Sequence, residues 1–216
     1  SGDVSLRLTS TSPLRAFRPD QGIWLASGAS IDVSGVARVD TTNIVGRRTG
    51  EVLSGGNVPL DASRGYVLAL PGSRIDLSGS AADLDVRQAG GIYAREHVAS
   101  EAGSLTINTT EGLVLASSIA AKGGASGAPD GRLEVAISSR RNADEAGTFP
   151  LTSRRIVITG DASPLALEPG APVPDSLNGQ AIIQTPVLNA AGFDDVSLTA
   201  LSTLVPRGLE DFLPPI

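Results

Sequence analysis

The chain contains no cysteine and no methionine, and only one histidine and one tryptophan. Without cysteine the protein has neither disulfides nor thiolate metal sites. The single histidine, His97, argues against a zinc site, because such sites usually draw on several histidine or cysteine ligands. Aromatic residues make up only 3% of the chain. Val, Ile, Leu and Ala supply the apolar volume instead, which favours a narrow, regular core over a compact enzyme packed around large rings.

The sequence also lacks long apolar runs and concentrated positive charge. No stretch approaches the ~20 apolar residues of a membrane-spanning helix. The formal net charge is −6, and the arginines are scattered, apart from adjacent pairs at 47–48, 140–141 and 154–155. Nucleic-acid binding needs clustered positive charge, so we expect no nucleic-acid partner. Because the chain begins at Ser1 and has no methionine, we expect a processed product or a cut piece of a longer protein.

What the sequence does contain is an internal repeat. The stretch GIWLASGASIDVSG at 22–35 returns as GYVLALPGSRIDLSG at 65–79, and a weaker copy, GLVLASSIAAKGG, occupies 112–124. The equivalent isoleucines of the three copies are Ile31, Ile75 and Ile119. Successive isoleucines are 44 residues apart, a spacing that chance resemblance is not expected to keep. The copies therefore indicate a repeat architecture.

Between these copies lie segments that alternate apolar and polar residues. They begin with glycine or aspartate and occupy 2–6, 103–107, 131–135 and 195–198. A period of two is that of a strand with one buried face. No amphipathic helix is evident, and Gly, Asn, Pro, Ser and Asp interrupt the chain throughout. Since these residues end strands and form turns, we expect an all-β protein.

Short strands broken at corners by glycine fit two all-β architectures. One is a sandwich or antiparallel barrel, and the other is a solenoid in which successive coils stack. The 44-residue spacing favours a solenoid, with coils of about 22 residues that place the three isoleucines on alternate coils. The predicted wall positions are Ile31, Val33, Ile75, Leu77 and Ile119. The predicted corner glycines are Gly35, Gly79 and Gly123.

Several segments break this rhythm. We expect a shaft over 1–203, with excursions near 41–59, 139–150 and 164–175 and a cap or linker at 204–216. The third excursion, PLALEPGAPVPD, holds four prolines, which cannot donate strand hydrogen bonds. Loops of this kind are where a solenoid concentrates its binding residues.

The tiles IDVSG and IDLSG, with the Gly-x-apolar-x-apolar strands, resemble filamentous-haemagglutinin-type exoproteins of Gram-negative bacteria. The closest part lies at 65–124, especially RGYVLALPGSRIDLSG and VASEAGSLTINTTEGLVLASSIAAKGG. The resemblance implies a right-handed parallel β-helix, exported by an outer-membrane two-partner-secretion transporter and displayed at the bacterial cell surface. It implies a structural shaft for adhesion, biofilm formation or contact-dependent delivery, with a host-cell or bacterial receptor or glycan as partner. We expect no enzyme activity and no cofactor.

One carboxylate pair is a candidate for chemistry. Asp32 and Asp76 hold equivalent tile positions. On alternate coils they would lie roughly 9–10 Å apart, at the upper limit for an inverting glycosidase. The third copy has Ala120 at this position. We therefore interpret each carboxylate as the cap of its own turn.

Other polar residues give weaker signals. His97 is the one candidate for a Ser-His-Asp triad, but no Gly-x-Ser-x-Gly motif surrounds any serine, and we interpret it as a loop histidine. The acidic pairs Asp83/Asp85 and Asp194/Asp195 lack the ligand spacing of a calcium loop. We assign no catalytic, cofactor or metal residue. Two alternatives to a shaft stay open: a carbohydrate-active β-helix enzyme, and a glycan- or receptor-binding module that uses the loops at 139–150 or 164–175.

Overall fold

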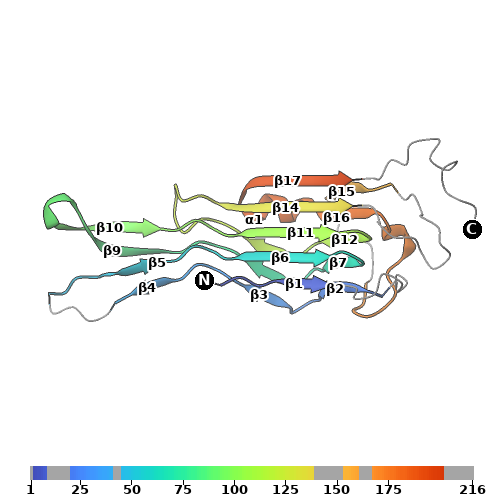
Figure 1. Ribbon diagram of the computed structural model, residues 1–216, viewed down its shortest axis with the longest axis horizontal. Helices are drawn as coiled ribbons and strands as arrows, with labels where there is room; N and C mark the ends of the chain where they lie inside the picture. Colours follow the sequence, from blue (N-terminus) through green and yellow to red (C-terminus); the bar gives the residue numbers. More distant parts are fainter. Residues whose placement is uncertain (1, 9–19, 41–44, 139–152, 161–166, 202–216) are drawn as a thin grey trace, which may run out of the picture.

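The computed structural model is built around three parallel β-sheets (Figure 1). It describes residues 2–8, 20–40, 45–138, 153–160 and 167–201. Within these ranges the chain forms strands, one short α-helix and two 3₁₀ turns. The prediction of an all-β protein is therefore confirmed.

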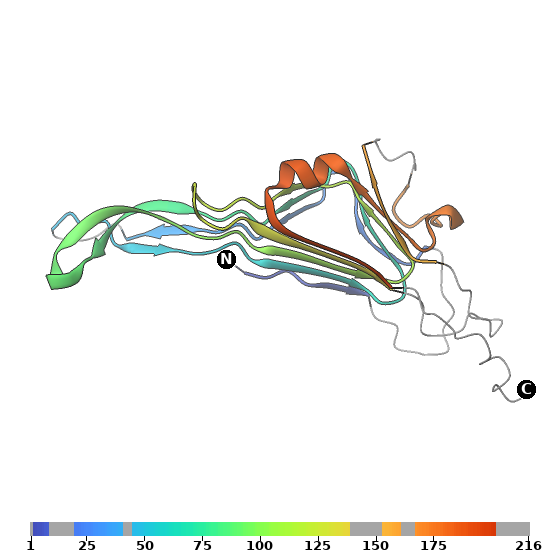
Figure 2. The same cartoon turned by 90° about the horizontal axis from the view of Figure 1, so that it is seen from above.

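Each of the three sheets collects strands from distant parts of the chain. Sheet A has the order β1 (Leu6–Leu8), β6 (Asn57–Ala62), β11 (Ser104–Thr109), β14 (Gly131–Ser138) and β17 (Phe193–Leu201). Sheet B has the order β15 (Arg155–Thr159), β16 (Gln180–Gln184), β12 (Gly112–Leu115), β7 (Tyr66–Ala69) and β2 (Gly22–Leu25). Sheet C has the order β13 (Ser118–Ala120), β8 (Arg74–Asp76) and β3 (Ser30–Asp32). Figure 2 looks along the direction in which the strands stack and shows the sheets as sides around one core.

From β1 to β14 the chain visits sheets A, B and C in turn and then returns to sheet A. After β14 it enters sheet B twice, as β15 and β16, before it returns to sheet A as β17. Ile31 is paired directly with Ile75, and Ile75 with Ile119, so the three lie on neighbouring strands. The prediction that they lie on alternate coils of about 22 residues is wrong. An antiparallel hairpin, β9 (Ala81–Arg87) and β10 (Tyr93–Ala99), lies between β8 and the next strand of sheet A. The 44 residues from Ile75 to Ile119 thus comprise this hairpin and one passage through the three sheets.

The segments expected to leave the wall agree with the structure only in part. A second antiparallel hairpin, β4 (Ala37–Val39) and β5 (Gly50–Val52), lies between β3 and β6. It overlaps the segment expected to leave the wall at 41–59, whose last residues, 57–59, belong to β6 in sheet A. From residue 167 onward, the segment expected at 164–175 has no strand and ends at the turn η2 (Asp175–Leu177). The segments at 139–150 and 204–216 lie outside the described residues.

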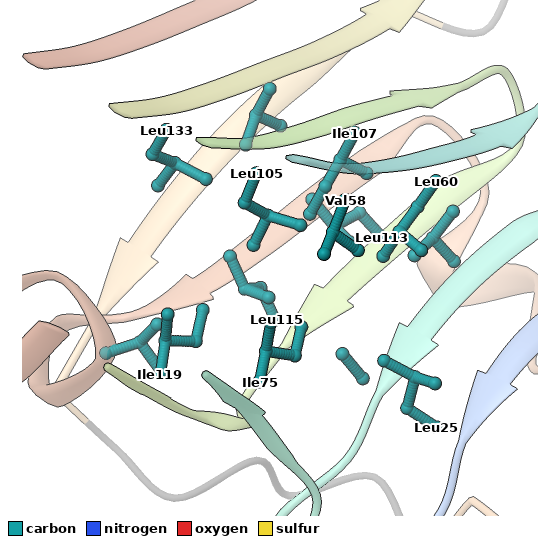
Figure 3. Packing of buried hydrophobic residues seen from close by; sticks show 14 of the residues in the cluster. Leu25, Val58, Leu60, Ile75, Leu105, Ile107, Leu113, Leu115, Ile119 and Leu133 are labelled. Carbon is teal, nitrogen blue, oxygen red and sulfur yellow. The ribbon is translucent and has the colours of Figure 1, made fainter. Parts of the chain in front are cut away.

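One apolar core fills the space between the sheets. In β14 buried and less buried residues alternate along Gly131–Ser138, as expected for a strand with one inward face. Figure 3 shows the inward side chains, among them Val58, Leu105 and Leu133 on neighbouring strands of sheet A. Ile31, Val33, Ile75, Leu77 and Ile119 all belong to this core. Stacked columns of branched side chains thus pack the interior.

The two strands β7 and β12 of sheet B are buried on both faces of the sheet. All four residues of each strand are buried. A second cluster, which includes Tyr66, Leu68, Val114, Val173 and Leu177, covers the outer face, and Trp24 packs against it. This explains why these two strands read as continuous apolar runs rather than as alternating ones.

The corner positions require glycine because no Cβ atom fits there, and not because their backbone is left-handed. A Cβ atom on Gly35 would lie 2.4 Å from the carbonyl oxygen of Leu53, and one on Gly79 would lie 2.3 Å from that of Ser100. At Gly123 the nearest backbone oxygen, of Ala128, would lie at 2.6 Å. None of the three has a φ in the left-handed region. Neighbouring backbone passes too close for any side chain.

A helix takes the place of strands at one end of sheet C. Helix α1 (Thr185–Ala191) packs against β13 and buries Val187 and Ala191. Sheets A and B have five strands each and sheet C has three. A helix about 10 Å across covers the height of roughly two strands spaced ~4.8 Å apart. The helix therefore fills the height of the two strands that sheet C lacks at this end of the stack. Gly192, with φ 82°, ends the helix.

Among the described residues, none of the helical segments has the length and apolar character that crossing a lipid bilayer requires.

Candidate interaction surface: the hairpin arm

The two hairpins leave the three-sheet body together. β4–β5 and β9–β10, with their turns, form what we call the arm, residues 36–40, 45–52 and 81–99. Figures 1 and 2 both show the arm extending to one side, beyond the ends of the wall strands. Since it adds nothing to the core of the body, it is the first place to look for a function beyond folding.

The two hairpins of the arm are fastened to each other. The backbone N–H of Asp85 donates to the carbonyl oxygen of Arg48 at 2.7 Å. The N–H of Arg48 in turn donates to Oδ2 of Asp85, also at 2.7 Å. Nearer the end of the arm, the Arg47 guanidinium carbon lies 3.9 Å from the centre of the Tyr93 ring. These contacts hold the hairpins as one unit.

A ladder of polar pairs crosses β9 and β10. Directly opposed residues pair: His97 Nδ1 lies 2.8 Å from Asp83 Oδ1, and Arg95 contacts both oxygens of Asp85 at 2.9 and 3.0 Å. The hydrogen bond from His97 lowers the pKa of Asp83. The hydrogen bond from Arg95 lowers the pKa of Asp85. Both carboxylates are thus ionised and already matched.

These polar pairs show what two candidates from the sequence do in the structure: His97 and the acidic pair Asp83/Asp85. His97 lies in strand β10 rather than in a loop, and its partner is a surface aspartate. Asp83 and Asp85 are bound to His97 and Arg95, so they are not free to form a calcium site together. Over the part of the chain that the structure describes, no group of three or more His, Asp or Glu side chains is arranged to hold a metal ion.

Asp32 and Asp76 lie on neighbouring strands of sheet C, closer than predicted. They are directly paired, at roughly the 4.8 Å spacing of adjacent strands, so the expected separation of 9–10 Å is wrong. Asp32 accepts hydrogen bonds from the N–H and hydroxyl of Ser34 at 3.0 and 2.7 Å. Asp76 accepts from the N–H of Ser78 at 3.1 Å and from Arg74 at 2.5 Å. Each carboxylate caps its own turn.

A polar groove of about 600 Å³ lies where strands of sheet A begin. Its lining includes Asn57, Glu101, Ser104, Arg132, Glu134, Asp194 and Asp195. Asp195 pairs with Arg132 at 2.9 Å, and Asp194 accepts the N–H of Asp130 at 2.8 Å. Asp195 thus pairs across two neighbouring strands of sheet A, and Asp194 holds the backbone just before β14.

No family model, no curated protein and no solved structure matches the chain. Function therefore has to be inferred from the geometry of this chain alone.

The hairpins were missed from the sequence, although a signal for one of them is present. Gly90 and Gly91 separate two alternating segments, DLDVR and YAREHVA, as in a β-hairpin. Both glycines have positive φ, 83° and 80°, in the turn η1 (Ala89–Gly91). Hairpin turns with two successive positive φ values favour Gly-Gly, Asn-Gly or Asp-Gly, because glycine adopts such values without strain.

The contacts of Asp85 predict how the arm responds to mutation. Replacing Asp85 with Asn should loosen the β4–β5 hairpin, because the side chain both accepts from Arg48 and pairs with Arg95. We expect faster amide hydrogen exchange at residues 45–52 with little change in global stability. Replacing Asp83 with Asn is the matched control, since its partner His97 lies on the same hairpin. Equal exchange in both variants would contradict the fastening role.

The carboxylates of sheet C predict a dependence of stability on pH. Hydrogen bonds from Ser34 lower the pKa of Asp32 below its ordinary 3.8. Burial raises the pKa of Asp76, but the hydrogen bonds from Arg74 and Ser78 outweigh it, and the net pKa is lowered. A lowered folded-state pKa stabilises the protein above the unfolded value and loses that effect as pH falls through the folded value.

We therefore expect the urea midpoint to fall as the pH drops below about 4. The variant Asp76→Asn should show a smaller fall between neutral and acidic pH, at the cost of a lower midpoint at neutral pH. A fall in Asp76→Asn as steep as in the unmodified protein would argue against this carboxylate as its source.

Proposed function

We propose that the chain is a shaft segment of a large secreted bacterial surface protein of the filamentous-haemagglutinin type. One observation carries the proposal: Ile31, Ile75 and Ile119 form one column on three neighbouring parallel strands. Each copy of the repeat thus presents to the next copy the same strand edge for parallel pairing. In this proposal the three sheets are the faces of a right-handed parallel β-helix, the hand that nearly all parallel crossovers take.

The proposed mechanism is mechanical. In such a shaft each passage is hydrogen-bonded only to its neighbours, and the apolar columns run along the stacking direction. The bonds that join the passages lie along this direction, for example Gly35 N–H to Ser78 O at 2.6 Å and Gly79 N–H to Lys122 O at 2.8 Å. The shaft would hold the arm and other regions away from the cell, after export through an outer-membrane two-partner-secretion transporter.

The alternatives gain less from the structure. A carbohydrate-active enzyme depended on Asp32 and Asp76, and both carboxylates are engaged in capping their turns. Of the two loops for a binding module, 139–150 lies outside the described residues, and in 164–175 the described part packs Leu167 and Val173 against the body. The arm is the protruding feature within the described residues, so display by a shaft is the function that the geometry supports best.

A duplicated repeat tests the shaft directly. A second copy of residues 57–103, inserted after Gly103, should fold and add one strand to each of the three sheets. X-ray scattering should then show a particle longer along the stack by roughly one strand spacing, ~4.8 Å, with a third hairpin in the arm. The matched control is the same insertion with the wall residues of the copy changed to serine. Aggregation of the first insertion as severe as that of the control would refute the shaft.

The surface location is tested separately. An epitope placed at the exposed turn around Gly127, where the structure has open space, should be reached by antibody on intact cells of the producing organism. Detection only after lysis would contradict surface display.

A further inference from the structure

The end of the arm exposes apolar side chains. We call Val45–Arg48 together with Arg87–Tyr93 the arm tip. Val45 and Ile92 are each 71% exposed, the highest values among the large apolar side chains of the described chain, and Tyr93 is 36% exposed. Single exposed apolar residues are ordinary, whereas three on one protrusion make it a candidate contact surface.

Arginines surround these apolar side chains. Arg47 stacks over the Tyr93 ring. Arg87 stands opposite Tyr93 in the hairpin register, and its guanidinium approaches the turn at Gly91. Two acids lie near the tip: Asp85 is bound to Arg95 and to the N–H of Arg48, and Glu96 accepts a hydrogen bond from Gln88. The tip itself contains three arginines and no acid. The tip is therefore locally cationic on a chain whose formal net charge is −6.

The shape of the tip limits its partner. Both hairpins end here, are fastened to each other, and protrude from the body (Figure 2). A protrusion of this kind meets a flat surface without obstruction from the body. Aliphatic side chains gain little from a hydrated glycan, whereas they gain free energy when they enter the boundary between lipid headgroups and acyl chains.

We propose that the arm tip docks onto an anionic lipid surface. Val45 and Ile92 enter the headgroup boundary, and Tyr93 lies at the level where its ring is apolar and its hydroxyl is wet. Arg47 and Arg87 donate hydrogen bonds to lipid phosphates. The acidic body is repelled by the same surface, so the arm approaches first. This inference goes beyond a shaft function and does not depend on it.

Vesicle binding tests the proposal. The 216-residue protein is sedimented with vesicles of phosphatidylcholine alone and of phosphatidylcholine mixed with phosphatidylglycerol. We expect stronger partitioning onto the mixed vesicles, weakened by added salt. Combining Val45→Ser with Ile92→Ser should lower it about tenfold or more, as expected for two aliphatic side chains that leave the lipid. Combining Arg47→Gln with Arg87→Gln should lower it roughly fivefold per arginine, on the mixed vesicles only.

Controls separate tip docking from nonspecific adsorption. Ile158 is 52% exposed and lies in β15, away from the arm, so Ile158→Ser should bind as the unmodified protein does. In Ile92→Trp, the indole emission should shift to the blue on mixed vesicles. Equal partitioning onto both vesicle types, equal losses in Ile158→Ser and the tip variants, or an unshifted emission would overturn the proposal.

Discussion

Alanine at position 103 should lower the melting temperature by roughly 6–12 °C, although it adds a single methyl group. A Cβ on Gly103 would lie 1.8 Å from the carbonyl oxygen of Gly56. That oxygen belongs to the backbone just before β6 and accepts the N–H of Ser104 at 3.3 Å. Relief of the clash would have to move one passage of the chain away from the next. Overpacking that cannot relax costs about 3 kcal/mol.

Two further glycines make this prediction specific. Gly124→Ala should be as harmful, because its Cβ would lie 1.8 Å from the carbonyl oxygen of Ser80. Gly160→Ala should leave the melting temperature within a degree or two, since no atom of the described residues lies within 4 Å of its Cβ and its φ is not left-handed. Thermal unfolding followed by circular dichroism compares the three. A melting temperature for Gly103→Ala equal to that of Gly160→Ala would contradict the close stacking.

The three corner glycines show how much of the fold could be predicted from the sequence. The positions of Gly35, Gly79 and Gly123 could be assigned to corners because each follows an apolar tile. The sequence does not show whether a corner needs a left-handed backbone or merely the absence of a side chain. That depends on how closely a distant passage approaches, as at Gly35, where the intruding atom belongs to Leu53.

The wall and the arm could not be told apart from pattern alone. Strands β9 and β10 alternate in the same way as wall strands, so half of the 44-residue repeat was assigned to a second coil. Period-two alternation reports a strand but not its partner. Antiparallel pairing with the next segment, rather than parallel pairing with the next repeat, sets the hairpin apart.

The polar ladder of the arm was equally hidden. His97 meets Asp83 only in the register that the turn at Gly90 and Gly91 imposes. A slip of one residue would place these side chains on opposite faces. Helix α1 was missed for a simpler reason: with seven residues it spans about two turns, too short for an apolar period to show.

Replacing Ile75 with Asp should have the largest effect of any single change proposed. Strand β8 is the middle strand of sheet C, and Ile75 is 0% exposed between Ile31 and Ile119. A carboxylate there either stays charged in an apolar core or takes up a proton, and both carry a high free-energy cost. We expect a loss of about 5 kcal/mol or more of the free energy of unfolding, measured by urea titration, which is enough to unfold many domains.

The column itself provides graded controls. Ile75→Val should cost only about 1 kcal/mol, because it removes one methyl group and buries no charge. Ile31→Asp should be less harmful than Ile75→Asp, since β3 is an edge strand and Ile31 is already 8% exposed. Ile92→Asp, at an exposed position of the arm, should leave the midpoint unchanged. An Ile75→Asp urea midpoint close to that of Ile92→Asp would refute the column. An aspartate leaves the midpoint unchanged only where water reaches its carboxylate, so residue 75 would then have to be exposed.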